Sequence, residues 1–302
     1  TSLLLDEDLH NQYKNESLDL EYLKKIEKEY GLPNLWPYIV LDRVVMFDAL
    51  RREYPHDTSQ YSHEEMLKIL QVNAKAIIKF LEKEKPDFIF MSLLGQISSA
   101  LLYHIAKKKG IKVFMWDNAR IENYCTLSNN YDNFSYAEEL FKYLIKNKKE
   151  SRKIIEARTH IKKVRQENTD QNTLYSWTKD NKKLIGRQWK WFLPNNLFKS
   201  LKWYLTLTTH YFTKKKWQDY TEENPITFLI DRIRRKTRTL IGYNSFYDPV
   251  NLKEDYAFFP LHYEPEITTL LYAPFWTDQI NLIRQIAKSL PIHFKLYVKE
   301  HP

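Results

Sequence analysis

The pattern that most constrains the fold lies between residues 88 and 116. Residues 88–91 and 111–116 are short apolar runs, and between them Ile97, Ala100, Leu101 and Ile105 recur at helical spacing. Gly110 stands where a helix C-terminal glycine belongs. A strand, a helix and a strand within about thirty residues are typical of a βαβ unit with parallel strands. The chain is therefore predicted to contain an α/β domain.

A long helix is predicted just before this unit. Ser62 and Glu65 have the spacing of a capping box, and Pro86 marks the boundary after the helix. One helical face of this segment carries Met66, Ile69, Leu70, Asn73, Ile77, Phe80 and Leu81. We expect that face to pack against the sheet.

The pattern recurs near the end of the chain. Residues 256–263 and 294–298 are predicted strands, and residues 277–290 are a predicted helix between them. This second βαβ unit predicts a second α/β domain. We therefore divide the chain into an α/β domain (1–130), a helical, basic and Trp-rich insertion or linker (131–249), and a second α/β domain that begins near residue 250 (250–302).

Composition limits the possible environment and partners. The formal net charge is +9, which favours anionic partners such as phosphates, nucleotides, nucleic acid or an acidic membrane. Cys125 is the single cysteine, so no intramolecular disulfide can form, which fits a reducing compartment such as the cytoplasm. The sequence has no apolar run of membrane-spanning length and does not open with a signal peptide.

Polar residues follow the predicted strands, where ligands bind in parallel sheets. In the first unit they lie in the predicted loops 92–96 and 117–123, and in the second they follow both strands. The candidates are Asp117, Asn118 and Arg120 in the first unit, and His262, Glu264, Glu266, Lys299, Glu300 and His301 in the second. Lysine and histidine suit a phosphate, and carboxylates suit a ribose hydroxyl or general-base work. The alternative is that these residues are solvated turn formers.

Three segments of the second unit, in order, suggest a family. FFPLHYEPEITTL, TDQINLIRQIAKSLP and LYVKEHP span about 45 residues and resemble the C-terminal domain of the bacterial capsule polysaccharide and surface carbohydrate biosynthesis family. FDALRREYP and the strand–helix–strand pattern that ends in DNARI resemble its N-terminal domain. The middle region resembles nothing in that family.

The resemblance implies a GT-B glycosyltransferase with two Rossmann-like domains, which transfers a sugar from a nucleotide-activated donor to a glycan or glycolipid acceptor. Some members use a CMP-sugar, and no separate cofactor or metal is expected. His301 and Lys299 would then hold the donor phosphate, with Glu266 and Glu300 beside them. Asp117 and Glu264 are the candidates for catalytic carboxylates, and Asn118 and Arg120 are the candidates on the acceptor side. A further half-domain follows in the family, so we expect this chain to end within its donor domain.

Two other functions stay open. Residues 182–217 contain nine Lys or Arg residues, no Asp or Glu, and Trp189, Trp191, Trp203 and Trp217. This composition suits an anionic membrane surface, with nucleic acid a weaker candidate, or a helical insertion whose rings pack inward. The chain could then be a peripheral protein without catalysis, although attachment to the inner membrane face is also compatible with the transferase. The second alternative is a GT-B nucleotide-sugar epimerase.

Overall fold

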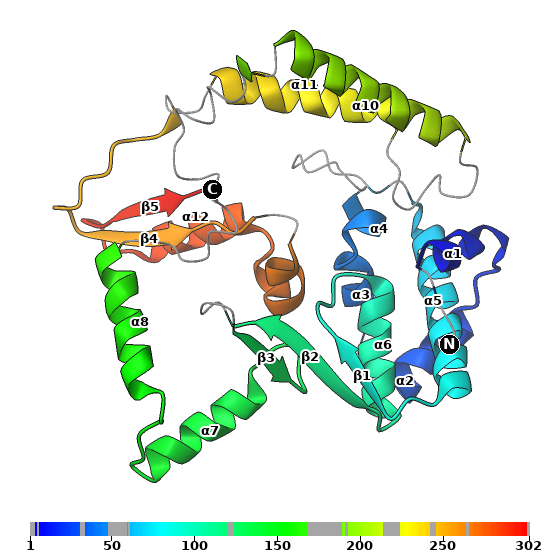
Figure 1. Cartoon of the computed structure of the whole chain (residues 1–302), viewed down its shortest axis with the longest axis horizontal. Coiled ribbons are helices and arrows are strands. Elements are labelled where there is room, and N and C mark those ends of the chain that lie inside the picture. The colour runs from blue at the N-terminus through cyan, green and yellow to red at the C-terminus, as the bar shows by residue number, and fades with distance from the viewer. Residues whose placement is uncertain are drawn as a thin grey trace.

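The protein has an α/β fold with two small sheets and many helices (Figure 1). The computed structural model describes Leu4, Ser59 and residues 6–30, 34–47, 61–119, 124–167, 189–190, 193–213, 224–241, 246–263 and 266–300. Three of the predicted site residues, Arg120, Glu264 and His301, lie outside this part of the chain.

The first sheet has the order β1 (Phe88–Met91), β2 (Lys112–Asn118) and β3 (Cys125–Ser128). Strands β1 and β2 are parallel and joined by α6 (Ile97–Lys108), so the predicted βαβ unit is confirmed. Helix α5 (His63–Glu84) precedes β1 and packs beside α6. It begins with the predicted capping box.

The prediction of a loop at residues 117–123 is wrong for the first two residues. Asp117 and Asn118 belong to β2 and pair with Thr126 and Cys125 of the antiparallel strand β3. Sequence reasoning missed β3 because it has four residues, two of them polar, and forms no apolar run. Its pairing satisfies the backbone of Asp117 and Asn118, which would otherwise lie at an open sheet edge.

A hydrophobic core fills the space between the first sheet and its helices. Four shorter elements contribute to it: η1 (Asn11–Asn15), α2 (Leu20–Glu29), α3 (Trp36–Val40) and α4 (Arg43–Phe47). Helix α1 (Asp6–His10) packs against α5. Members of this core that are almost fully buried include Ile26, Ile39, Leu41, Ile69, Leu70, Leu94, Ile97, Leu101 and Ile105. The predicted inward faces of α5 and α6 thus meet in one core, as their 3.6-residue periodicity requires.

Asp42 is a buried carboxylate that ties two helices together. Its Oδ2 accepts the Ile97 N–H at the start of α6 (3.1 Å), and its Oδ1 accepts the N–H groups of Val44 (3.1 Å) and Val45 (3.3 Å) in α4. Burial raises the pKa of Asp42 to about 6, and these three hydrogen bonds oppose part of that rise. The pKa of Asp42 is thus higher in the folded protein than in the unfolded chain. This difference stabilises the folded protein at low pH, and the stabilisation is lost as the pH rises through about 6.

The second sheet confirms the second predicted βαβ unit. Strands β4 (Tyr256–Pro260) and β5 (Lys295–Lys299) are parallel, with Pro260 opposite Lys299, and α12 (Gln279–Ser289) connects them. Strand β4 ends three residues before the predicted boundary, although the Leu261 N–H still donates to the Lys299 carbonyl at 2.8 Å.

The described part of residues 131–249 is largely helical. It contains α7 (Ser135–Lys146), α8 (Ile154–Glu167), α10 (Pro194–Thr213) and α11 (Pro225–Ile241). Helices α7 and α8 run from the first sheet towards the second, whereas α10 and α11 lie side by side at the far end of the molecule (Figure 1). No helix within the described ranges is both long and apolar enough to cross a membrane.

The segment after β4 returns to the first sheet. A π-helical turn, η5 (Thr268–Tyr272), is followed by a short 3-10 helix, η6 (Pro274–Trp276). Leu270 is only 6% exposed and belongs to the core beneath the first sheet. Ile267 lies so close to Gly95 that a Cβ on that glycine would be 3.0 Å from Ile267 Cδ1. Residues 267–272 therefore pack on the first unit although they follow a strand of the second.

Candidate functional site

A cavity of about 230 Å³ lies against the carboxyl-terminal half of β2. Its walls come from the segment after β1, from β2 and β3, from the turn after β3, and from η5. Four aromatic rings line it: Trp116, Tyr131, Phe134 and Tyr272. Its polar lining includes Asp117, Asp132, Asn130, Asn133, Ser92, Thr126 and Ser128. Aromatic rings mixed with a few oriented polar groups are the usual composition of a small-molecule site.

Strand β2 positions Asp117. Side chains alternate across a strand, so Asp117 lies on the same face as the buried Met115, two residues earlier. Its backbone is held by pairing with Thr126, and its Oδ1 accepts the N–H of Asn118 at 2.7 Å. The carboxylate itself is exposed to solvent. Of the residues predicted for the first unit, Asp117 lines the cavity and Asn118 is next to it on the strand.

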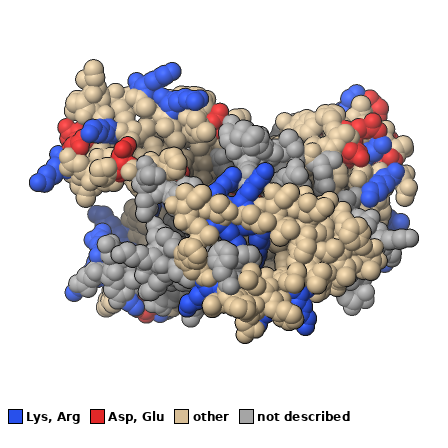
Figure 2. Space-filling model, turned by 90° about the horizontal axis from the view of Figure 1, so that it is seen from above, with Lys and Arg blue, Asp and Glu red and all other residues tan. Residues whose placement is uncertain are grey.

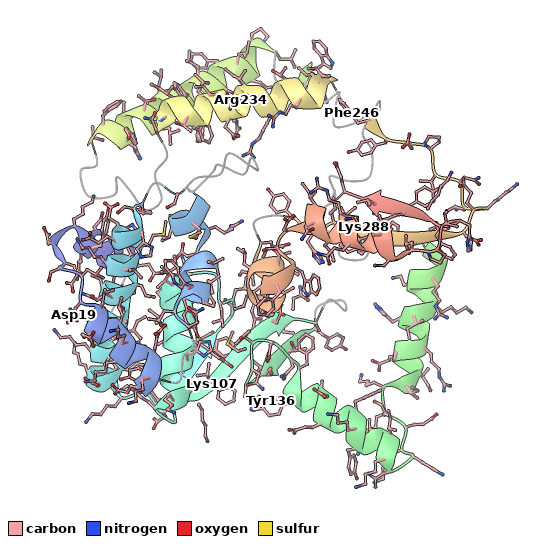
Figure 3. The ribbon with its side chains drawn as sticks, turned by 180° about the vertical axis from the view of Figure 1, so that it is seen from behind. Asp19, Lys107, Tyr136, Arg234, Phe246 and Lys288 are labelled. Atoms are coloured by element: carbon pink, nitrogen blue, oxygen red, sulfur yellow. The ribbon has the colours of Figure 1, made fainter. Side chains whose placement is uncertain are left out.

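The turn after β3 forms a second wall and is held from two sides. The Ser128 hydroxyl donates to the carbonyl of Asn133 at 2.7 Å and accepts the N–H of Asn130 at 3.1 Å. From α6, Lys107 Nζ donates to Asn130 Oδ1 at 2.7 Å and to the carbonyl of Asn129 at 3.3 Å (Figure 3 labels Lys107). These bonds hold the turn in place, and the only side chains of the cavity lining that they involve are those of Ser128 and Asn130.

Tyr272, from the segment that follows β4 of the second unit, also lines this cavity. Its ring stacks on Tyr131 with centroids 6.1 Å apart, and its hydroxyl donates to the Tyr131 carbonyl at 3.2 Å. Burial, followed by the negative charge of Asp117, raises the pKa of Tyr272. The hydroxyl thus stays protonated beside the carboxylate. Sequence reasoning missed Tyr131 and Tyr272 because nothing in their local pattern separates them from the other tyrosines.

Behind the cavity lies a cluster of aromatic rings around His104 of α6. Tyr38, Tyr103 and Tyr131 each make an edge contact with the imidazole, with centroids 5.0 to 6.1 Å away. Burial, helped by the charge of Lys107, lowers the pKa of His104 to about 4. The neutral imidazole of His104 thus packs against Tyr131, which lines the cavity.

His104→Phe is expected to change how stability depends on pH. The unfolded chain protonates His104 below about 6.5, whereas the folded protein holds it neutral down to about 4. The neutral His104 therefore makes its full contribution to the stability of the wild-type protein above pH 6.5, and this contribution is lost as the pH falls. Between pH 7 and pH 4.5 the variant should gain about 2–3 kcal/mol relative to wild type.

Urea unfolding of both proteins at the two pH values measures this difference. The opposite contribution of Asp42 is common to both proteins and cancels in the comparison. A difference between wild type and variant that does not change with pH would contradict the assignment of a neutral, buried imidazole.

A second group of predicted residues lies at the carboxyl edge of β4 and β5. His262 follows β4 and Glu300 follows β5, beside the paired residues Pro260 and Lys299. The Tyr247 hydroxyl donates to Glu300 Oε2. The structure therefore brings His262, Lys299 and Glu300 to one sheet edge.

Two adjacent residues at the start of α12 hold that edge in place. The Asp278 side chain caps the helix by accepting the N–H of Asn281 at 2.9 Å. The buried Gln279 side chain clamps the His262 backbone, accepting its N–H at 2.7 Å and donating to its carbonyl at 3.0 Å. Asp278 thus fixes the start of α12, and Gln279 fixes the loop after β4.

Glu266 lies apart from that edge along the chain, two residues before η5. Its carbonyl accepts the N–H groups of Thr269 and Leu270 at 3.1 and 2.9 Å. Residues 261–272 thus connect the two groups of predicted residues: they begin at the edge that carries Lys299 and end in the cavity that contains Asp117. Among the described residues, no three His, Cys, Asp or Glu side chains gather closely enough to hold a metal ion.

Comparisons with models of protein families, with curated proteins and with solved structures gave no match to this chain. The chemistry of the site therefore follows from its side chains. Carboxylates accept hydrogen bonds, amides both donate and accept, and aromatic rings offer flat apolar faces. This combination suits a ligand that has several hydroxyl groups and apolar C–H faces.

Proposed function

We propose that this protein is a glycosyltransferase of GT-B architecture that moves a sugar from a nucleotide-activated donor to a bacterial surface glycan. The observation that carries the proposal is the cavity at β2, where Asp117 lies among aromatic rings and Tyr272 arrives from the segment after β4. The resemblance of residues 258–302 to the capsule polysaccharide family agrees with it. Nucleotide sugars are available in the cytoplasm, which is the location the proposal requires.

The cavity at β2 is the proposed acceptor site. A sugar ring can lay a C–H face against Tyr131 or Tyr272, and its hydroxyl groups can bond to Asp117, Asn130 and Asp132. The turn that carries Asn130 and Asp132 is already held by Ser128 and Lys107, so little ordering would accompany binding.

The carboxyl edge of β4 and β5 is the proposed donor site. Lys299 supplies positive charge for the donor phosphates, and the backbone of His262 is held in place by Gln279. Glu300, which accepts from Tyr247, suits a ribose hydroxyl. His301 keeps the role that the resemblance implies for it, and Glu264 and Arg120 stay candidates because they follow predicted strands. All three lie outside the described residues.

In the proposed mechanism Asp117 is the general base. An acceptor hydroxyl in the cavity loses its proton to the carboxylate while its oxygen bonds to the anomeric carbon of the donor. The bond between that carbon and the phosphate oxygen breaks, and the leaving nucleotide takes the bonding electrons. Lys299 stabilises the charge on the departing phosphate. The neutral Tyr272 hydroxyl, near Asp117, contributes polarity without competing for the proton.

The test combines nucleotide binding with product analysis on the full chain. We expect titration calorimetry against CMP, UDP and GDP to detect binding of at least one of them, and that binding to weaken in Lys299→Ala. With the matching sugar nucleotide and an oligosaccharide acceptor, we expect a glycosylated product. A changed sugar nucleotide formed without any acceptor would show an epimerase instead, and no nucleotide binding at millimolar concentration would refute the proposed donor site.

A further inference from the structure

Helices α10 and α11 form a helical hairpin that stands apart from both sheets (Figures 1 and 3). The two helices contact each other through Trp203 and Phe228, whose ring centroids are 5.0 Å apart. The guanidinium of Arg232 covers both rings at 5.6 and 5.5 Å from their centroids. No described residue of α10 is buried, so this contact leaves most of the helix surface open.

Helix α10 exposes an apolar stripe. Five of its large apolar side chains are exposed: Leu197, Phe198, Leu201, Leu205 and Phe212. At about 100° per residue these positions fall within a sector of roughly 100° on the helix. Phe198 and Phe212 are 68% and 71% exposed, although they are among the most apolar side chains of the chain.

Helix α11 repeats this arrangement with aliphatic residues. Ile226, Leu229, Ile230, Ile233 and Ile241 are all exposed. The first four follow the i, i+3, i+4, i+7 spacing that puts side chains on one face of a helix. By the same spacing, Trp203 and Phe228, which join the two helices, lie on the opposite side of each helix from its stripe, so the contact between the helices covers neither stripe. A continuous exposed apolar stripe marks an interaction site more often than scattered exposed residues do.

Positive charge surrounds these stripes. The basic residues of the two helices are Lys199, Lys202, Arg232, Arg234, Arg235, Lys236 and Arg238, and Asp231, the acidic one, is paired with Arg235. Figure 2 looks down on the hairpin and shows a broad uncharged surface crossed by Lys and Arg side chains. Asp and Glu, mixed with Lys and Arg, lie over the parts of the molecule on either side.

We propose that the α10–α11 hairpin docks on the surface of an anionic lipid bilayer. Leu, Ile and Phe side chains would enter the boundary between headgroups and acyl chains, while Lys and Arg would bind lipid phosphates. The hairpin lies on this surface rather than spanning the bilayer, since neither helix is apolar enough to cross it. This inference does not depend on the proposed function, because it uses no residue of the cavity or of the β4–β5 edge.

The chemistry favours lipid over two other partners. A nucleic acid would use the positive charge and stack on aromatic rings, but the exposed stripe of α11 is entirely aliphatic. A second copy of the chain would bring two basic surfaces together, which like-charge repulsion opposes. An anionic bilayer matches both the apolar stripes and the charge.

Vesicle flotation of the full chain tests the proposal. We expect binding to vesicles that contain 30% phosphatidylglycerol, little binding to pure phosphatidylcholine, and weaker binding in 0.5 M NaCl. The double variant Phe198→Glu, Phe212→Glu should bind at least tenfold less. Lys199→Gln with Lys202→Gln should also bind less, by about fivefold for each charge removed.

The matched control is Leu252→Glu. Leu252 lies outside the hairpin and is 72% exposed, about as much as Phe198 and Phe212, so this variant should bind vesicles like wild type. Circular dichroism checks that every variant stays folded, as expected for substitutions at exposed positions. Equal binding by Phe198→Glu, Phe212→Glu and wild type would overturn the proposal. So would hairpin-dependent binding of single-stranded DNA or hairpin-dependent dimerisation in place of vesicle binding.

Discussion

Asp117→Asn is expected to lower kcat for the proposed sugar transfer about 10²–10⁴-fold, the range over which a positioned general base contributes. Asparagine keeps the size of the side chain, and its amide oxygen can still accept the Asn118 N–H that Asp117 Oδ1 accepts. The variant should therefore fold normally and bind the acceptor, but it cannot take the proton from an acceptor hydroxyl. KM for the acceptor should change much less than kcat.

The matched control for this variant is Asp87→Asn. Asp87 is an exposed aspartate just before β1, at the opposite end of the first sheet from the cavity. Steady-state kinetics of both variants separates a role in the cavity from a general effect of losing one negative charge. Equal losses in the two variants, or an unchanged kcat in Asp117→Asn, would remove Asp117 from the mechanism.

Leu270→Ala is expected to lower the free energy of unfolding by about 2–5 kcal/mol, the usual cost of truncating a buried leucine. Leu270 is 6% exposed and lies in the core under the first sheet, although it follows β4 of the second. It lies two residues before Tyr272 in η5, so acceptor binding should weaken as well.

Urea unfolding followed by circular dichroism measures the stability change. Leu252→Ala is the control: Leu252 is 72% exposed, and its truncation should cost less than about 0.5 kcal/mol. If the two variants were equally stable, residues 267–272 would not be docked on the first unit in solution. The cavity would then lack the wall that Tyr272 provides.

The two parallel units could be predicted from local sequence because their signals are local. Helical spacing, the Ser62–Glu65 capping box and short apolar strands each depend on residues close together in the chain, and both βαβ units are confirmed. Asp117 could be selected as a candidate site residue because ligands bind beyond the carboxyl ends of parallel strands. The edge that carries His262 and Lys299 follows from the same rule.

The remaining features depend on contacts between distant residues. Strand β3 exists because β2 offers it a pairing partner, and this pairing makes Asp117 part of a strand. The domain borders at 130 and 250 stay predictions, whereas the structure shows that residues 267–272 pack on the first unit. No local pattern could indicate that packing, because any apolar segment of that length suits several surfaces.

The sequence by itself therefore determined the two βαβ units, the parallel pairing of their strands and the strand ends where polar side chains gather, since these depend on backbone geometry and short-range periodicity. Only the tertiary structure decided that Tyr131 stacks on Tyr272, 141 residues further along the chain, and that Leu270 completes a core begun near residue 13. It also decided that the apolar sides of α10 and α11 stay exposed. Burial is a property of the whole fold, so periodicity predicts that an apolar face exists but not what covers it.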